Sequence, residues 1–100
     1  MRLIDDAVVQ AKLRIQKALL GEISESVRAV IFSVSENSLK IKFYLDGEIS
    51  KDDRESASCI ETEVIADYED WWSVECECIR ADAPQEINGE GFWVFRRRKY

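Results

Sequence analysis

Apolar residues in the first 20 positions recur at steps of three and four. This spacing places them on one face of an α-helix, which we expect over residues 3–20. Gly21 follows as a helix stop, because glycine readily adopts the positive φ of a C-terminal cap. The apolar face consists of Ile4, Val8, Ala11, Ile15, Ala18 and Leu19.

A different period begins after this helix. Residues 27–35 are rich in β-branched and apolar side chains, and residues 39–46 alternate between apolar and polar. Alternation with period two is typical of a strand with one buried and one polar face. The break at residues 36–38 therefore predicts a β-hairpin, with Leu39, Ile41 and Phe43 facing the core.

A second helix is indicated over residues 51–66. Ser50 precedes Asp53 by three positions, an arrangement similar to a capping box. The predicted apolar face carries Ala57, Ile60, Val64 and Tyr68, and the opposite face carries Asp52, Glu55, Cys59 and Glu63.

Alternation returns at residues 71–80, with Trp72, Val74, Cys76 and Cys78 on the predicted core face. Residues 92–97 form a last, aromatic strand, after a loop that contains Pro84. If strands 39–46 and 71–80 pair, Lys40 and Lys42 lie opposite Glu75 and Glu77. The predicted fold is α+β in the order α-β-β-α-β-β, with a four-stranded, mainly antiparallel sheet and two helices on one face. We expect residues 1–100 to form a single domain.

Charge is unevenly distributed along the chain. Residues 46–77 hold 12 acidic and two basic side chains, a local net charge of −10, whereas the whole chain carries −6. Such a field repels nucleic acid and anionic membranes and attracts a basic protein. Neither a membrane-spanning apolar run nor a secretory signal is recognisable, so we expect a cytoplasmic protein.

The residue types argue against an enzyme and against a metal or other cofactor. The chain has no histidine, which excludes Ser–His and Cys–His nucleophile pairs. Its three cysteines are an odd number, and Cys76 and Cys78 with Cys59 lack a histidine to complete a mixed metal site. We therefore expect three free thiols. Neighbouring carboxylates such as Asp52 and Asp53 diverge on a helix, and no calcium-loop pattern surrounds Asp67.

One aromatic residue and one basic cluster each have alternative interpretations. Trp71 either anchors a binding surface or covers the open sheet face against Tyr44, Trp93 or Phe95. The basic residues 96–99 either contact nucleic acid or, as we favour, pair with the acidic face of the same chain or guard a strand edge.

Part of the sequence resembles a bacterial immunity-protein family. The resemblance is carried by the segments FYLDGEIS at residues 43–50 and DRESASCIETEVIAD at residues 53–67, with ALLGEI at the end of the first helix. Proteins of this kind are small α+β inhibitors encoded beside polymorphic toxins and contact-dependent growth inhibition toxins. The resemblance implies a cytoplasmic protein that binds and neutralises a cognate toxin.

The leading hypothesis is thus an immunity protein with an acidic face for a basic, nuclease-like toxin. An alternative is an assembly subunit that homodimerises through the aromatic sheet face, and a third is a small enzyme that uses carboxylates alone. The predicted partner-binding residues are Asp52, Glu55, Glu63, Asp67, Glu69, Asp70 and Trp71.

Overall fold

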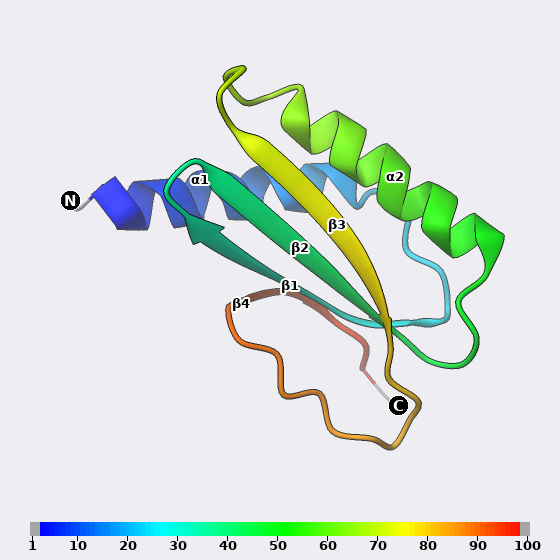
Figure 1. Cartoon of the computed structure of the whole chain (residues 1–100). Helices are drawn as coiled ribbons and strands as arrows, with labels where there is room; N and C mark the ends of the chain where they lie inside the picture. Colours follow the sequence, from blue (N-terminus) through cyan, green and yellow to red (C-terminus); the bar gives the residue numbers. More distant parts are fainter. Residues whose placement is uncertain (1–2, 99–100) are drawn as a thin grey trace.

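The structure, a computed structural model, describes residues 3–98, with side chains from residue 6 onward. Its elements follow the predicted α-β-β-α-β-β order and confirm the α+β class (Figure 1). Ile4 of the first predicted apolar face and Lys99 of the basic cluster lie outside the described side chains. The elements are α1 (Leu3–Ala18), β1 (Val27–Ser35), β2 (Ser38–Leu45), α2 (Lys51–Ile65), β3 (Ser73–Arg80) and β4 (Phe92–Arg96).

The four strands form one sheet in the order β3-β2-β1-β4. Strand β1 pairs antiparallel with both β2 and β4, whereas β2 and β3 are parallel. A parallel pair needs a long connection, and α2 provides it. The predicted pairing across this connection is confirmed, since Lys40 faces Glu75 and Lys42 faces Glu77.

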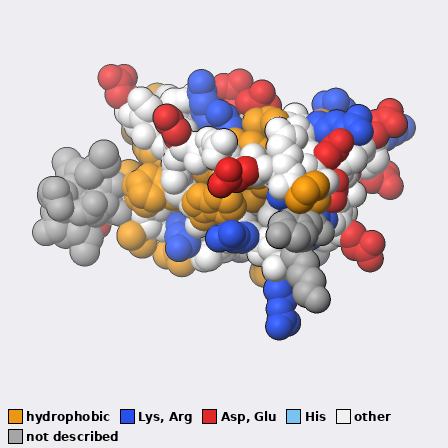
Figure 2. All heavy atoms as spheres, turned by 90° about the horizontal axis from the view of Figure 1, so that it is seen from below, with side chains coloured by type: hydrophobic (Ala, Val, Ile, Leu, Met, Phe, Trp, Pro, Cys, Tyr) orange, Lys and Arg blue, Asp and Glu red, His pale blue; other side chains and the backbone are white. Residues whose placement is uncertain are grey.

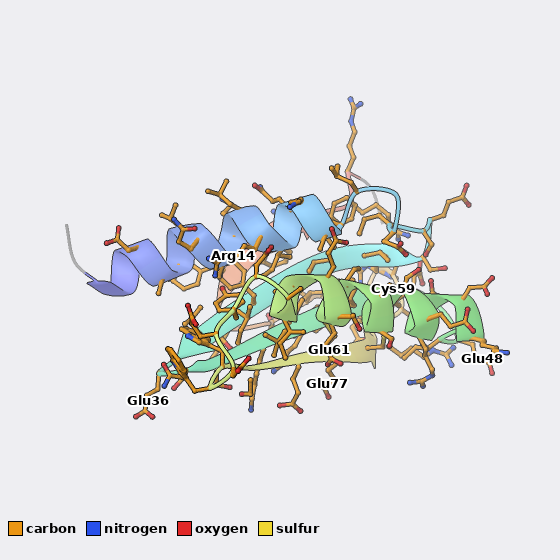
Figure 3. The ribbon with its side chains drawn as sticks, turned by 90° about the horizontal axis from the view of Figure 1, so that it is seen from above. Arg14, Glu36, Glu48, Cys59, Glu61 and Glu77 are labelled. Carbon is orange, nitrogen blue, oxygen red and sulfur yellow. The ribbon has the colours of Figure 1, made fainter. Side chains whose placement is uncertain are left out.

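Both helices lie on the same face of the sheet, as predicted (Figure 3). Ile15 of α1 and Ile60 and Val64 of α2 are fully buried against the sheet. The sheet contributes the predicted inward positions of β2, because Ile41 and Phe43 belong to the same cluster. Burial of these apolar side chains is the main stabilising contribution of the fold.

The start of α2 is fixed by short polar contacts. The Ser50 hydroxyl oxygen accepts a hydrogen bond of 3.0 Å from the backbone N–H of Asp53, as the capping motif predicts. The Asp53 carboxylate accepts a 2.8 Å hydrogen bond from the Ser24 hydroxyl, so it joins the helix to the loop after α1.

The third strand begins two residues later than expected. Trp71 and Trp72 lie in the turn before β3, so neither has a strand-like orientation. Trp72 was predicted to join the main core, and this prediction is wrong. Its ring instead packs on Tyr68 at a centroid distance of 4.7 Å. Trp71 points into solvent and does not cover the sheet.

Tyr44, Trp93 and Phe95 were expected on one open face of the sheet, and the structure corrects this expectation. A β-bulge in the β1–β4 pairing sets Trp93 opposite Ile31 and Phe95 opposite Val30. A bulge inserts an extra residue and so reverses the direction of the side chains that follow. Phe95 consequently packs against the helix-side core, while Trp93 stays on the other face.

That other face is partly covered by residues 81–91. Ala81 and Ile87 from this segment pack with Ile31 and Tyr44 in a second, smaller apolar cluster. A Cβ on Gly89 would lie 2.6 Å from Ile31 Cδ1, so a side chain at this position would force Ile31 to shift. Tyr44 is therefore buried and not available on an open aromatic face.

Candidate protein-binding surface

The predicted helix residues lie on the outward face of α2. Asp52, Glu55 and Glu63 are all exposed, and their opposite face packs into the core through Ile60 and Val64. Asp52 and Glu63 are eleven positions apart in the sequence, which corresponds to about 16 Å along an α-helix. Lys51 is 4.0 Å from Glu55, but both side chains are highly exposed and such a pair contributes little.

The remaining predicted residues lie in the turn between α2 and β3. Asp67, Glu69 and Asp70 are exposed there, and Trp71 exposes 66% of its surface. We call the seven predicted residues, Asp52, Glu55, Glu63, Asp67, Glu69, Asp70 and Trp71, the acidic surface. They follow one another along the helix and the turn, as the sequence predicts.

The turn is ordered by its own backbone. The N–H of Asp67 donates to the Val64 carbonyl at 3.1 Å, and the N–H of Trp72 donates to the Glu69 carbonyl at 3.0 Å. The N–H of Ser73 then donates to the Asn37 carbonyl at 2.9 Å, which ties the turn to the β1–β2 hairpin. The exposed Trp71 is thus held on a defined support, and less conformational entropy is lost when it binds a partner.

Electrostatics at the C-terminal end of α2 are unfavourable in the isolated protein. The last turn contains no basic residue, while Glu63 lies within it and Asp67 just beyond it. Carboxylates at the negative end of a helix dipole each cost about 0.3–1 kcal/mol at low ionic strength. A cation placed there by a partner would remove this cost.

A groove of about 290 Å³ lies between the start of α1 and this turn. Asp6 of α1 and Asp67 and Glu69 of the turn line it, so three carboxylates surround it. Arg14, at 4.3 Å from the Tyr68 ring centroid, is the basic residue of its lining. The groove has the charge to accept a lysine or arginine side chain. Asp6 was not among the predicted residues, because only folding brings α1 to the turn.

Other acidic residues of the 46–77 segment have different roles. Asp46 accepts a 3.1 Å hydrogen bond from Arg97 of the basic cluster in an ion pair. Glu61 accepts a 2.9 Å hydrogen bond from the backbone N–H of Cys76. Glu75 and Glu77 face Lys40 and Lys42 on the far side of the sheet. The local charge of −10 is therefore divided between structural contacts and the acidic surface.

The cysteine thiols and the carboxylates are the groups of this chain that could ligate a metal ion. All three cysteines are free, with Cys59 exposed and Cys76 and Cys78 half-buried against the core. Within the described part of the chain, no three His, Cys, Asp or Glu residues are grouped so as to hold a metal ion. The helices of residues 3–98 include none that is long and apolar enough to cross a membrane.

A second group of exposed side chains is apolar and was not predicted from the sequence. Val9, Leu13 and Leu20 near or within α1 are more than half exposed, and Phe92 of β4 is 48% exposed. Seen from below, apolar side chains form a band across the middle of the molecule, with Lys and Arg side chains beside it (Figure 2). The seven-residue spacing from Leu13 to Leu20 was the available sequence signal.

The family comparison agrees with the resemblance in the sequence. Residues 9–99 match the family model described as MafI2 immunity protein. The chain belongs to the MafI2 immunity protein family. The match extends from α1 to the basic C-terminal cluster, so it includes α2, the acidic turn and β4. This MafI2 protein is therefore an immunity protein, and its partner is a toxin. The comparison with curated proteins found no match.

Proposed function

We propose that this MafI2 protein neutralises its toxin in the cytoplasm by binding a basic, nuclease-like domain through the acidic surface. The observation that carries the proposal is the set of carboxylates at the C-terminal end of α2, which no basic residue of the last turn compensates. Their repulsion from the helix dipole is relieved when a toxin supplies Lys or Arg side chains. Inhibition then requires binding and no catalysis by the immunity protein.

A nuclease suits this surface because it must hold a phosphate backbone. Phosphate-binding clefts are lined by Lys and Arg, and a row of carboxylates along about 16 Å of helix can pair with several of them. We infer that Asp52, Glu55 and Glu63 contact such a cleft. The toxin's nucleic acid substrate and the acidic surface would then compete for the same basic side chains.

The turn after α2 supplies the apolar part of the proposed interface. Trp71 is 66% exposed, and tryptophan is among the residues that contribute most to binding energy at protein interfaces. The groove beside it, with Asp6, Asp67 and Glu69, has room and charge for one toxin Lys or Arg side chain. We infer that Trp71 packs on the toxin while this groove takes a basic side chain.

Self-association through an aromatic sheet face has less support. Tyr44 is buried beneath residues 81–91, and Phe95 packs into the helix-side core. Only Trp93 of the three aromatic residues keeps a substantially exposed side chain on that face, at 39%.

The proposal is tested with the purified toxin and a pair of charge-reversed variants. Glu55→Lys/Glu63→Lys should weaken toxin binding by about 100-fold or more and abolish protection of toxin-expressing cells, because two attractive contacts become repulsive. The matched control is Glu86→Lys/Glu90→Lys, which changes the net charge equally at exposed positions of the 81–91 segment. Equilibrium titration gives the affinities, and thermal unfolding verifies that both variants fold.

The control variant should keep toxin affinity within about threefold of the parent, since it leaves the acidic surface intact. Equal losses in the two variants would show that net charge, and not the acidic surface, controls binding. Unchanged affinity in both would contradict the proposed interface and direct attention to the exposed apolar side chains of Val9, Leu13, Leu20 and Phe92.

A further inference from the structure

A basic hollow lies at the opposite face of the sheet from α2. Its volume is about 840 Å³, and residues 84–87 form one wall while Trp93 and the end of β4 form the other. Among the residues that the structure describes, four arginines contribute to its lining, together with a single carboxylate, Glu86. The arginines are Arg28, Arg96, Arg97 and Arg98. In a chain of net charge −6, this is a strong local excess of positive charge.

Two of the arginines are held in place without losing their charge. The Nη1 group of Arg28 donates a 2.7 Å hydrogen bond to the Ala81 carbonyl, which is uncharged. The Arg96 guanidinium lies 5.6 Å from the centre of the Trp93 ring. Among the described residues, no carboxylate forms an ion pair with Arg28, Arg96 or Arg98. The positive charges of Arg96 and Arg98 are therefore available to a ligand, while that of Arg28 is partly offset by the nearby Asp82 carboxylate.

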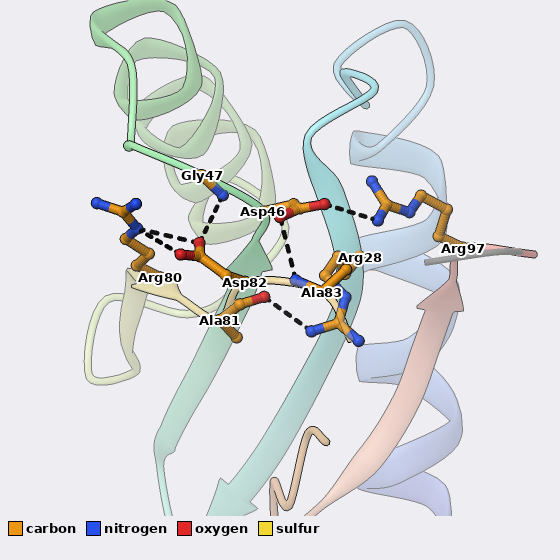
Figure 4. A network of polar contacts seen from close by, with 8 residues as sticks. All are labelled: Arg28, Asp46, Gly47, Arg80, Ala81, Asp82, Ala83 and Arg97. Carbon is orange, nitrogen blue, oxygen red and sulfur yellow. Dashed lines mark hydrogen bonds and ion pairs between the residues drawn. The ribbon is translucent and has the colours of Figure 1, made fainter. Parts of the chain in front are cut away.

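One carboxylate joins the two walls (Figure 4). Asp46 Oδ1 accepts a 3.1 Å hydrogen bond from the backbone N–H of Ala83, at the start of the loop wall. Asp46 Oδ2 accepts another of 3.1 Å from Nη2 of Arg97, which follows β4, and Nη1 of Arg97 donates to the Glu25 carbonyl at 2.8 Å. The separation of the walls is thus set before any ligand binds.

A neighbouring carboxylate holds the base of the loop wall. Asp82 accepts 2.8 Å and 3.0 Å hydrogen bonds from the Gly47 N–H and from Nε of Arg80 (Figure 4). The Arg80 guanidinium, and then the Gly47 N–H, hold the pKa of Asp82 below its usual range. Asp82 therefore remains charged under mildly acidic conditions and keeps β3 tied to the turn after β2.

We propose that this hollow binds a short, carboxylate-rich segment of a protein. Guanidinium groups form paired hydrogen bonds with carboxylates, and prior orientation reduces the entropy lost on binding. A long polyanion such as nucleic acid fits less well, because its phosphates would extend beyond the hollow toward Glu75 and Glu77 on the same face of the sheet. The site is on the opposite sheet face from α2, so it is separate from the proposed toxin interface.

The probe for this site is a fluorescein-labelled hexaglutamate peptide, titrated into the full chain and followed by fluorescence anisotropy. The expected result at low salt is saturable binding that Arg96→Gln/Arg98→Gln weakens at least about tenfold, equivalent to about 1.4 kcal/mol. The matched control is Lys12→Gln/Lys17→Gln, which removes two exposed positive charges from α1 and should change the affinity less than about twofold. Hexaglutamine should not bind.

A second variant tests the positioning role of Asp46. Asp46→Ala removes a negative charge beside the hollow, so simple electrostatics predicts tighter peptide binding. Release of the Arg97 and Ala83 contacts predicts weaker binding, which is the result that we expect. Tighter binding by a folded Asp46→Ala protein would overturn the claim that Asp46 sets the separation of the two walls. If that variant does not fold, the Arg96 and Arg98 substitutions still test the site.

Three results would overturn the proposal as a whole. These are absence of saturable hexaglutamate binding, equal losses in the arginine variant and its lysine control, and tighter binding of a hexathymidylate oligonucleotide than of the peptide. Glu55→Lys/Glu63→Lys should bind the peptide at least as tightly as the parent. Failure of the hollow is therefore distinguishable from failure of the toxin interface.

Discussion

Glu61 has a structural role that its position on an acidic helix does not reveal. Its carboxylate accepts the N–H of Cys76 from β3, a strand at the edge of the sheet. An edge strand has unpaired backbone groups that can recruit other chains, and this contact satisfies one of them. Glu61 is thus part of the fold, whereas Glu63, two residues later, is exposed and belongs to the acidic surface.

The same contact affects the neighbouring thiol. Burial, and then the negative charge of Glu61, raise the pKa of Cys76 from 9.0 to about 12. Burial also raises the pKa of Cys78, although the charge of Arg54 opposes this. Because the thiolate is the reactive form, both cysteines should react slowly at neutral pH.

We predict that a brief treatment with iodoacetamide at pH 8 modifies Cys59 first. Cys59 is exposed on α2, while the Cys76 thiol is half-buried and remains protonated at a pH well below 12. Peptide mass spectrometry of the folded protein should show at least about tenfold faster labelling of Cys59 than of Cys76. The control is a sample unfolded in denaturant, in which all three thiols should react at similar rates. Equal rates in the folded protein would contradict the described burial of β3.

At the scale of elements, the sequence predicts most of the fold. The two periods of 3.6 and two residues predict the helices and strands, and the Ser50 motif predicts the start of α2. Features that depend on contacts distant in sequence are not predictable in this way. The bulge that separates Trp93 from Phe95 arises from the pairing of β4 with β1, and the parallel β2–β3 pair arises from the α2 crossover.

The register of the sheet makes opposite predictions for adjacent residues of β2. Phe43 is 3% exposed in the main core, and Phe43→Ala should reduce the free energy of unfolding by about 3–5 kcal/mol. Lys42 points to the other face, and Lys42→Ala should cost less than about 0.5 kcal/mol. Urea unfolding of the two variants measures the difference. Similar small losses would mean that β2 is shifted by one residue.

For the whole molecule, the main feature is separation of charge between two faces. The sequence shows an acidic segment and a basic C-terminal cluster, and from these the acidic surface on α2 and its turn could be proposed. The acidic groove and the basic hollow could not, because each combines residues from distant segments. Asp6 meets Asp67 only after α1 packs beside α2, and Arg28 meets Arg96 only through the pairing of β1 and β4.

The central claim is that carboxylates of α2 and its turn attract and hold a basic toxin. Attraction between exposed charges increases the association rate and is screened over about 10 Å at 0.1 M salt. The most direct test is therefore the association rate constant of toxin and immunity protein, measured by stopped flow between low and high ionic strength.

The parent protein should associate rapidly at low salt and lose speed steeply as salt is added. Glu55→Lys/Glu63→Lys should associate at least about tenfold more slowly at low salt and depend much less on salt, whereas Glu86→Lys/Glu90→Lys should behave almost as the parent. Equal association rates for the parent and the Glu55→Lys/Glu63→Lys variant at every salt concentration would contradict the acidic surface as the toxin-binding site.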